Sequence, residues 1–332
     1  MVRADDPTIV KTIDVGGTTN GLSTPLLVDS DNDRIVDLVY AGDLKGNLWK
    51  FDVAGTNTSL WKSAYLSGAT PVPLFQAKDS LGNTQPITSL PEVGKAPAGA
   101  TGFMVYFGTG KYYETSDNTS ISIQSVYGVV DSGNAFTGAN HRTHLQAQTI
   151  DFETTIPATV VNGVVTVAEK NVRVLSDNSV NYPTQQGWVM DLLTPPNPPG
   201  TQKGERMITA PALFDGKLLL QTIAPSASLC DYGGTSWLFQ VNPATGGALQ
   251  TAGFDLNGDG LFNSVDMIDI GGGVMKYVSG LDINVGISGG FGKPIKAGSK
   301  AFIPLSGSSG NIGAPPISSG TLKPRASWRQ IQ

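Results

Sequence analysis

The sequence predicts an all-β protein, and three observations support this prediction. The 332 residues include 41 glycines and 21 prolines, and only 15% of the residues are charged. Glycine and proline destabilise helices, and solvated helices usually carry more charged side chains. Helical periodicity is hard to find, whereas short runs of β-branched and aromatic residues are bounded by Gly, Pro, Asn or Asp. This pattern is typical of many short strands that are joined by tight turns.

Seven runs carry the clearest strand pattern. They span residues 34–41, 46–53, 102–107, 125–131, 187–193, 216–223 and 235–242. Between the first two, Gly42, Asp43 and Gly46 supply the flexible backbone of a hairpin turn. The ranges 76–100 and 150–184 are expected to be long surface insertions.

A loose repeat relates three of these runs, which begin at Gly46, Gly187 and Ser236. In each copy a small residue precedes Trp or Leu-Trp, apolar residues alternate, and Asp or Asn closes the run. Such recurrent units predict a β-propeller of four-stranded blades, in which aromatic side chains pack between neighbouring blades. A β-sandwich is the less favoured alternative. We therefore predict a single, partial or modified β-propeller over residues 1–332.

Composition narrows the classes of partner and compartment. The net charge of −5 supplies no basic face, so we expect no nucleic-acid partner. Cys230 is the single cysteine, which excludes an internal disulfide framework. No run approaches the roughly 20 apolar residues of a membrane span, and the first residues lack the apolar region of a signal peptide. The chain is therefore either intracellular or a piece of a longer exported protein.

The first acidic segment, residues 29–37, has the spacing of a calcium loop. The candidate ligands at positions 1, 3, 5, 7 and 9 are Asp29, Asp31, Asp33, the backbone carbonyl of Ile35, and Asp37. Carboxylates that converge without a cation repel one another, and a divalent ion removes this conflict. The segment therefore predicts a Ca²⁺ site.

This first loop departs from an EF-hand loop in two places. Arg34 stands where the sharp-turn glycine is expected, and Tyr40 replaces the acid at position 12. The residues that follow indicate a strand and not a helix. A solvated acidic turn is the alternative interpretation.

The second acidic segment, residues 255–266, fits the EF-type spacing more fully. Its candidate ligands are Asp255, Asn257, Asp259, the carbonyl of Leu261, Asn263 and Asp266. Gly260 occupies position 6, where the backbone must turn sharply. We predict a second Ca²⁺ site here, with a plain Asn-Gly-Asp-Gly turn as the alternative.

Signatures of catalysis are weak. The two histidines lie in the segment 140–144, which we interpret as an exposed loop. The Gly-Thr-Gly-Lys stretch at 108–111 lacks the complete frame of a phosphate loop, and no Gly-x-Ser-x-Gly elbow is present. We therefore predict that the chain is not an enzyme.

Several segments together resemble the PilY/PilC family of type IV pilus factors. The resemblance begins with STPLLVDSDNDRIVDLVYAGDLKGNLWKFDV at 23–53 and continues in order along the chain. Further matching stretches lie at 105–114, 204–225, 230–247 and 255–266, and the chain ends with RASWRQI at 325–331. These stretches span nearly the whole sequence.

The resemblance implies the C-terminal part of a longer secreted protein, located at the pilus or outer-membrane surface and folded as a modified β-propeller. It implies that calcium at the 29–37 loop regulates pilus extension and retraction and that the protein serves surface attachment. The implied partners are minor pilins or the pilus tip and a host-cell receptor.

Two other functions stay open from the residues alone. The NPATGGAL stretch at 242–249 resembles the repeat of propellers that hold pyrroloquinoline quinone with calcium, which suggests a dehydrogenase. Against it, the chain is short for eight blades. A lectin-like, glycan-binding propeller is the other alternative.

Overall fold

The computed structural model describes residues 11–182, 184–195, 200–226 and 234–283, together with the short segments 295–297, 300–304, 312–313 and 316–318. Strands dominate this part of the chain. Its helices are four short 3-10 turns, η1 (Thr58–Leu60), η2 (Thr115–Asn118), η3 (His141–His144) and η4 (Ser264–Asp266). None of them has the length and apolarity that crossing a membrane requires. The all-β prediction is confirmed.

Three sheets each contain a four-stranded antiparallel meander. The first consists of β1 (Leu26–Val28), β2 (Leu38–Gly42), β3 (Asn47–Asp52) and a split fourth strand, β4 (Lys62–Ser63) with β7 (Phe75–Gln76). The second consists of β8 (Glu92–Lys95), β9 (Phe103–Gly108), β10 (Ser125–Asp131) and β16 (Gly187–Asp191). The third consists of β17 (Ala212–Phe214), β18 (Lys217–Pro225), β19 (Gly234–Val241) and β22 (Gly280–Asp282). These meanders are the blades of the predicted propeller.

Additional strands extend the blades. In the second sheet, β11 (Gln146–Gln148) pairs in parallel with β16, and in the third sheet β15 (Lys170–Leu175) and β12 (Ile150–Ile156) follow β22. Small separate ribbons are formed by β5 (Leu66–Ser67) with β6 (Thr70–Pro71), β13 (Thr159–Val161) with β14 (Val164–Val167), β20 (Met267–Asp269) with β21 (Met275–Tyr277), and the trio β23 (Ile295–Ala297), β24 (Lys300–Pro304) and β25 (Ile312–Gly313).

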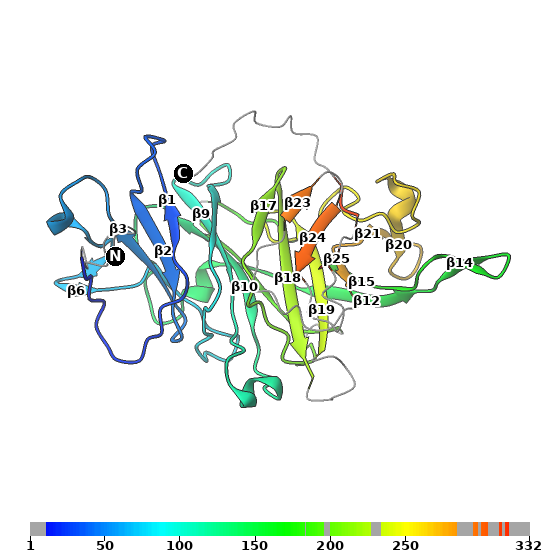
Figure 1. The fold of residues 1–332 in the computed structure, drawn as a ribbon, viewed down its shortest axis with the longest axis horizontal. Coiled ribbons are helices and arrows are strands. Elements are labelled where there is room, and N and C mark those ends of the chain that lie inside the picture. The colour runs from blue at the N-terminus through cyan, green and yellow to red at the C-terminus, as the bar shows by residue number, and fades with distance from the viewer. Residues whose placement is uncertain are drawn as a thin grey trace.

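The three large sheets stand side by side in chain order and do not close into a ring (Figure 1). The middle sheet is buried on both faces, and β10 shows why. Tyr127 and Val129 pack toward the first sheet, whereas Val126 and Val130 belong to the core shared with the third sheet. Successive side chains of a strand point to opposite faces, so one run of apolar residues supplies two cores.

The Trp-containing repeat falls on three different sheets. Trp49 lies in β3, Trp188 in β16 and Trp237 in β19. β3 and β19 are the third strands of their meanders, whereas β16 is the fourth. The repeat therefore marks one strand per blade, although the copies are not all equivalent in topology.

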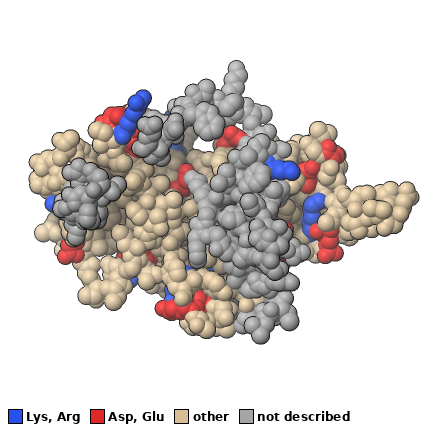
Figure 2. Space-filling model, viewed as in Figure 1, with Lys and Arg blue, Asp and Glu red and all other residues tan. Residues whose placement is uncertain are grey.

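The expected insertions are largely part of the sheets. The range 76–100 contains β8, and the range 150–184 contains β12 and β15, whose buried Val172 and Val174 belong to the core of the molecule. The expectation of a surface insertion therefore fails for most of 150–184. Only the β13–β14 ribbon projects away from the sheets (Figure 1), and its surface is free of charge toward the tip (Figure 2).

The expected strand at 34–41 is also shorter in the structure. It begins at Leu38, because residues 34–37 complete the acidic loop that precedes it.

Candidate metal centre

The first acidic loop joins β1 to β2. These strands pair antiparallel with Val28 opposite Leu38, and the Asp37 N–H donates to the Val28 carbonyl at 3.0 Å. The hairpin therefore brings the first and last residues of the loop close together, and the residues between them wrap around one point.

Backbone amides inside this loop point at its carboxylates. The N–H groups of Asn32 and Arg34 donate to the two oxygens of Asp29 at 2.6 and 2.9 Å. Asn32 and Arg34 reach these positions with positive φ angles of 70° and 75°. The carboxylate of Asp29 thus organises the turn before any ion is considered.

Asp37 is held from the other side of the loop. The hydroxyl and then the backbone N–H of Ser30 donate to Asp37 Oδ2, at 2.7 and 2.8 Å. These hydrogen bonds keep the pKa of Asp37 below its ordinary value, because they favour the ionised form. At neutral pH the loop therefore presents an ionised carboxylate at this position.

Carboxylate oxygens of Asp29, Asp31 and Asp37 lie within 4.8 Å of one another. Calcium takes oxygen ligands at about 2.3–2.6 Å, so oxygens on opposite sides of one ion are separated by roughly 5 Å. The donor set is composed of hard oxygens and fits Ca²⁺. Within the described part of the chain, it is the one such group of three acidic or histidine side chains.

The two remaining predicted ligands of this loop are less closely placed. Asp33 lies outside the group of three, and its Oδ1 accepts the N–H of Ile35 at 2.7 Å. Ile35, two residues after Asp33, is exposed, and its backbone carbonyl stays the predicted fifth ligand.

The second acidic loop has the same internal hydrogen bonds. The N–H groups of Gly258 and Gly260 donate to the two oxygens of Asp255 at 2.6 and 2.9 Å, the distances found for Asn32 and Arg34 with Asp29. Gly258 and Gly260 have φ angles of 78° and 79°. Both loops therefore share one backbone template.

The same match holds for the next two bonds. The hydrogen bond from Asp33 N–H to Asp31 and the one from Asp259 N–H to Asn257 are both 3.0 Å long. Ile35 and Leu261 each donate to the aspartate two residues before them, and both of these bonds are 2.7 Å long. Position by position, the two sequences fold in the same way through position 7.

The loops diverge after position 7. Asp266 is buried, and its two oxygens accept the N–H groups of Leu256 at 2.7 Å and Asn263 at 3.0 Å. Asn263 caps η4 by accepting the Val265 N–H at 2.8 Å. Asp266 thus accepts the N–H at position 2 of its loop, as Asp37 does in the first loop, whereas Asn263 is engaged as the cap of η4.

A lysine lies beside the second loop. Lys170 donates to the Leu256 carbonyl at 2.7 Å, and burial lowers its pKa while the nearby charges of Asp255 and Asp266 act in the opposite direction. Because a cationic side chain already offsets part of the acidic charge, the second loop has less need of a divalent ion. The first loop is the stronger candidate metal centre.

The two histidines are not in an exposed loop as expected. They lie on η3, where His141 Nδ1 accepts the Gln76 N–H at 2.9 Å and the ring packs 5.5 Å from that of Phe75. Burial lowers the pKa of His141. These contacts connect η3 with β7, so the role of His141 is structural.

The fold and its loops define a class of protein, namely a β-propeller segment with two acidic loops, the first of which joins the paired strands β1 and β2. Residues 3–160 match the family described as the PilY1 beta-propeller domain. The chain belongs to the PilY1 family.

Two curated relatives carry the same family name. A type IV pilus biogenesis factor PilY1 homolog of Xylella fastidiosa is 36% identical over 231 residues, which are 69% of this chain and 14% of that protein. The type IV pilus biogenesis factor PilY1 of Pseudomonas aeruginosa strain UCBPP-PA14 is 34% identical over 296 residues, 77% of this chain and 24% of that protein. The chain thus spans about a quarter or less of the length of these relatives.

A solved structure supports the same fold. The crystal structure of the Pseudomonas aeruginosa PilY1 C-terminal domain superposes with a TM-score of 0.73 at 28% sequence identity, and the match covers 96% of this chain and 65% of that one. The predicted family and the predicted modified propeller are confirmed. The resemblance at 325–331 and Cys230 lie outside the described residues.

Proposed function

We propose that this chain is the calcium-binding propeller module of a type IV pilus biogenesis and adhesion factor. Calcium binds at the 29–37 loop and regulates pilus extension, pilus retraction and surface attachment. The module acts at the pilus or outer-membrane surface, with minor pilins or the pilus tip and a host-cell receptor as partners. No catalytic step is part of this function.

The observation that carries the proposal is the convergence of Asp29, Asp31 and Asp37 within 4.8 Å on a loop whose two ends are held by β1 and β2. Three carboxylates in one place disfavour the ion-free loop through repulsion. A bound ion reverses the sign of this interaction, so it stabilises the closed form of the loop and the hairpin that carries it.

The role in pili is supported by the relatives, which are type IV pilus biogenesis factors. A hairpin loop whose closed form is stabilised by calcium provides a surface whose shape depends on the ion. In this mechanism a partner binds the closed loop, and the loss of calcium releases the partner. The second loop serves as a structural turn with a weaker calcium response.

Calcium titration by calorimetry, combined with thermal unfolding, tests the proposal. The chain, Asp31→Asn and Asp14→Asn are compared in calcium-free buffer and with increasing CaCl₂. Asp14 is exposed and lies outside both loops, so its variant removes the same charge elsewhere. Calcium should raise the unfolding temperature of the chain and of Asp14→Asn, and this response should be largely lost in Asp31→Asn.

An unchanged calcium response in Asp31→Asn would contradict the assignment of the first loop. A parallel measurement on cells that carry the same substitutions in the full-length protein addresses the pilus role. Asp31→Asn should alter the calcium dependence of surface pilus number, whereas Asp14→Asn should not. If binding is lost while pilus number keeps its calcium dependence, the regulatory role is wrong.

A further inference from the structure

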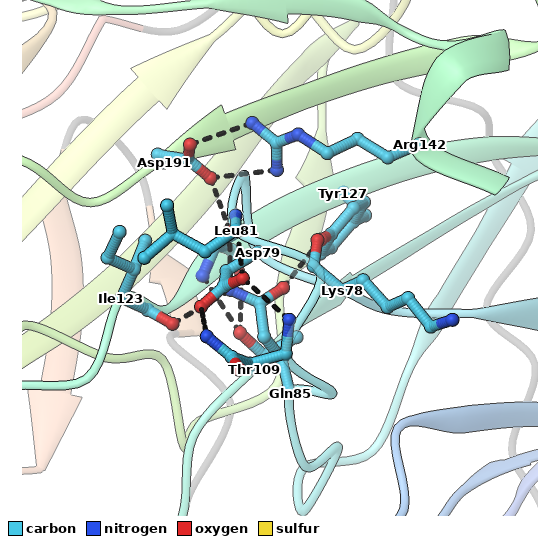
Figure 3. A network of polar contacts seen from close by, with 11 residues as sticks. Lys78, Asp79, Leu81, Gln85, Thr109, Ile123, Tyr127, Arg142 and Asp191 are labelled. Carbon is cyan, nitrogen blue, oxygen red and sulfur yellow. Dashed lines mark hydrogen bonds and ion pairs between the residues drawn. The ribbon is translucent and has the colours of Figure 1, made fainter. Parts of the chain in front are cut away.

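The short helix η3 connects the first two sheets. On one side, Arg142 donates from both terminal nitrogens to the two oxygens of Asp191 in β16, at 2.9 and 2.7 Å (Figure 3). On the other side, His141 Nδ1 accepts the N–H of Gln76 in β7 at 2.9 Å. η3 therefore links the sheet that carries the 29–37 loop to its neighbour.

These two attachments differ in how they respond to acid. The guanidinium of Arg142 stays protonated at every pH at which proteins work. The bond from Gln76, in contrast, needs a ring nitrogen with a free lone pair, which only the neutral imidazole of His141 offers. Once Nδ1 is protonated, two donors face each other and the bond is lost. Histidine is the side chain that ordinarily changes its charge between pH 5 and 8.

The surroundings of His141 do little to compensate a positive charge. The ring is half-buried, and the rings of Phe75 and Phe136 lie 5.5 and 5.8 Å from it. Within the described residues, no carboxylate forms an ion pair with His141. The acid on the neighbouring strand, Asp191, is already bound by Arg142.

Cations approach the ring from two elements. Lys78 follows β7, and its ammonium donates to the Ala139 carbonyl at 2.7 Å, while its own carbonyl accepts the Tyr127 hydroxyl at 2.7 Å (Figure 3). Arg142 and His144 lie on η3 itself. Each of these three side chains is a cation or becomes one when it is protonated.

The remaining neighbours add no negative charge. The segment 132–139, which leads into η3, contains no charged side chain. Burial raises the pKa of Tyr127, so its hydroxyl stays uncharged. The segment rests on the first sheet through Phe136, whose N–H donates to the Leu74 carbonyl at 2.9 Å and whose ring packs 5.0 Å from that of Phe75.

We propose that η3 is an acid-sensitive latch between the first and second sheets. Uptake of a proton at His141 Nδ1 breaks the bond to Gln76, and the charges of Lys78 and Arg142 repel the imidazolium. η3 stays bound to β16 through Arg142, so it separates from β7. The sheet that carries the 29–37 loop thereby loses one of its contacts with the second sheet. The latch does not require calcium.

The direction of the pH response follows from the charge balance. Burial, followed by the charges of His144 and Lys78, lowers the pKa of His141 below its ordinary value of 6.5, and a hydrogen bond with the backbone of Gly138 acts in the opposite direction. A histidine with a lowered pKa in the closed form stabilises that form above pH 6.5, and this stability is lost as the pH falls from 6.5 through the closed-form value. If the open form has the ordinary pKa, the equilibrium constant for opening rises by up to about tenfold between about pH 7.5 and about pH 5.5.

NMR of the isotope-labelled chain tests the latch. The chain has two histidines, so His144→Gln leaves His141 as the single imidazole, while the glutamine can still donate to the Thr137 carbonyl that His144 contacts. The ring nitrogen signals of His141 and the hydrogen exchange of the Gln76 amide are followed across this pH range. The protection factor of Gln76, which corrects for the pH dependence of chemical exchange, should fall by up to about tenfold as the ring charges. The β10 amides should keep their protection.

His141→Asn is the matched control. Asparagine Oδ1 offers an acceptor near the position of Nδ1 that does not titrate. The Gln76 protection factor of this variant should therefore not depend on pH in the same range. The His144→Gln protein tests the latch even if the control folds poorly. Charging of His141 with no loss of Gln76 protection, an equal loss in His141→Asn, or a parallel loss in β10 would overturn the proposal.

Discussion

Arg34 and Gly260 occupy the same position in two separate acidic loops. Their φ angles are 75° and 79°, and each donates its backbone N–H at 2.9 Å to the first aspartate of its loop. The left-handed conformation is easily reached by glycine but not by residues with a Cβ atom. The first loop therefore carries backbone strain that the second loop avoids.

Replacing Arg34 with glycine should relieve this strain. The left-handed conformation costs roughly 1–2 kcal/mol in a non-glycine residue, and the greater freedom of glycine in the unfolded chain cancels part of the gain. We expect the Arg34→Gly variant to be more stable by about 0.5–1 kcal/mol. Urea unfolding in calcium-free buffer measures this difference. Arg34→Lys keeps the strain and the charge, so an equal gain in that variant would refute the explanation.

Lys50 and Asp131 connect the first two sheets through a buried ion pair. Lys50 Nζ lies 2.7 Å from Asp131 Oδ2, and the hydroxyls of Tyr40 and Tyr65 also donate to this carboxylate, which is almost fully buried. Lys50→Met removes the only cation bound to Asp131 among the described residues and leaves a buried charge uncompensated. The free energy of unfolding should fall by about 3 kcal/mol.

The matched control for this change is Lys62→Met in β4, because Lys62 is exposed. Its free energy of unfolding should change by no more than about 0.5 kcal/mol. Chemical unfolding of both variants measures the two values. Similar losses in the two variants would show that the buried pair has no special contribution.

Acid stability should depend on the same carboxylate. Burial alone would raise the pKa of Asp131, but hydrogen bonds from Lys50, Tyr40 and Tyr65 outweigh it and keep the pKa below its ordinary value of 3.8. A lowered pKa in the folded state contributes stability above pH 3.8, and this stability is lost as the pH falls toward the folded value. The stability advantage of the chain over Asp131→Asn should therefore shrink below about pH 4. An advantage that grows on acidification would contradict the lowered pKa.

Gly246 allows Trp188 to pack in the core between the second and third sheets. Gly246 has a φ angle of 70°, and a Cβ atom there would lie 2.3 Å from the Trp188 ring. Gly246→Ala should destabilise the chain by about 2–4 kcal/mol through backbone strain and overpacking. Gly55→Ala has a similar φ of 73° but open space around it, so it measures the strain alone. Thermal unfolding should therefore show a clearly larger loss for Gly246→Ala than for Gly55→Ala.

Local features of the structure could be predicted from the sequence. The strand at 125–131 matches β10 residue for residue, because its apolar pattern and its flanking polar residues act within a few positions. The acidic loops could also be located, because all their candidate ligands lie within 9 or 12 consecutive residues. The hydrogen bonds of Asp29 and Asp255 to amides 3 and 5 residues ahead are local in the same sense.

Other features depend on contacts between distant segments. The range 150–184 is expected from the sequence to be a surface insertion, yet β15 lies in a sheet because it pairs with β22, more than 100 residues later. The pair of Lys50 with Asp131 and the bond of Arg206 to Lys111 likewise join residues that no sequence pattern relates. Asp33 lies outside the group formed by Asp29, Asp31 and Asp37, although spacing alone ranks the four aspartates equally.

The sequence by itself therefore determined the all-β class, the blade-forming strands, the family and the place of both acidic loops. Each of these depends on the order of neighbouring residues, which sets strand alternation and turn geometry. The tertiary structure alone decided which carboxylates converge, which loop has a lysine beside it and which buried charges pair, as Lys50 and Asp131 do. These outcomes depend on distances between side chains, some within one folded loop and others between distant strands, and only the three-dimensional fold sets those distances.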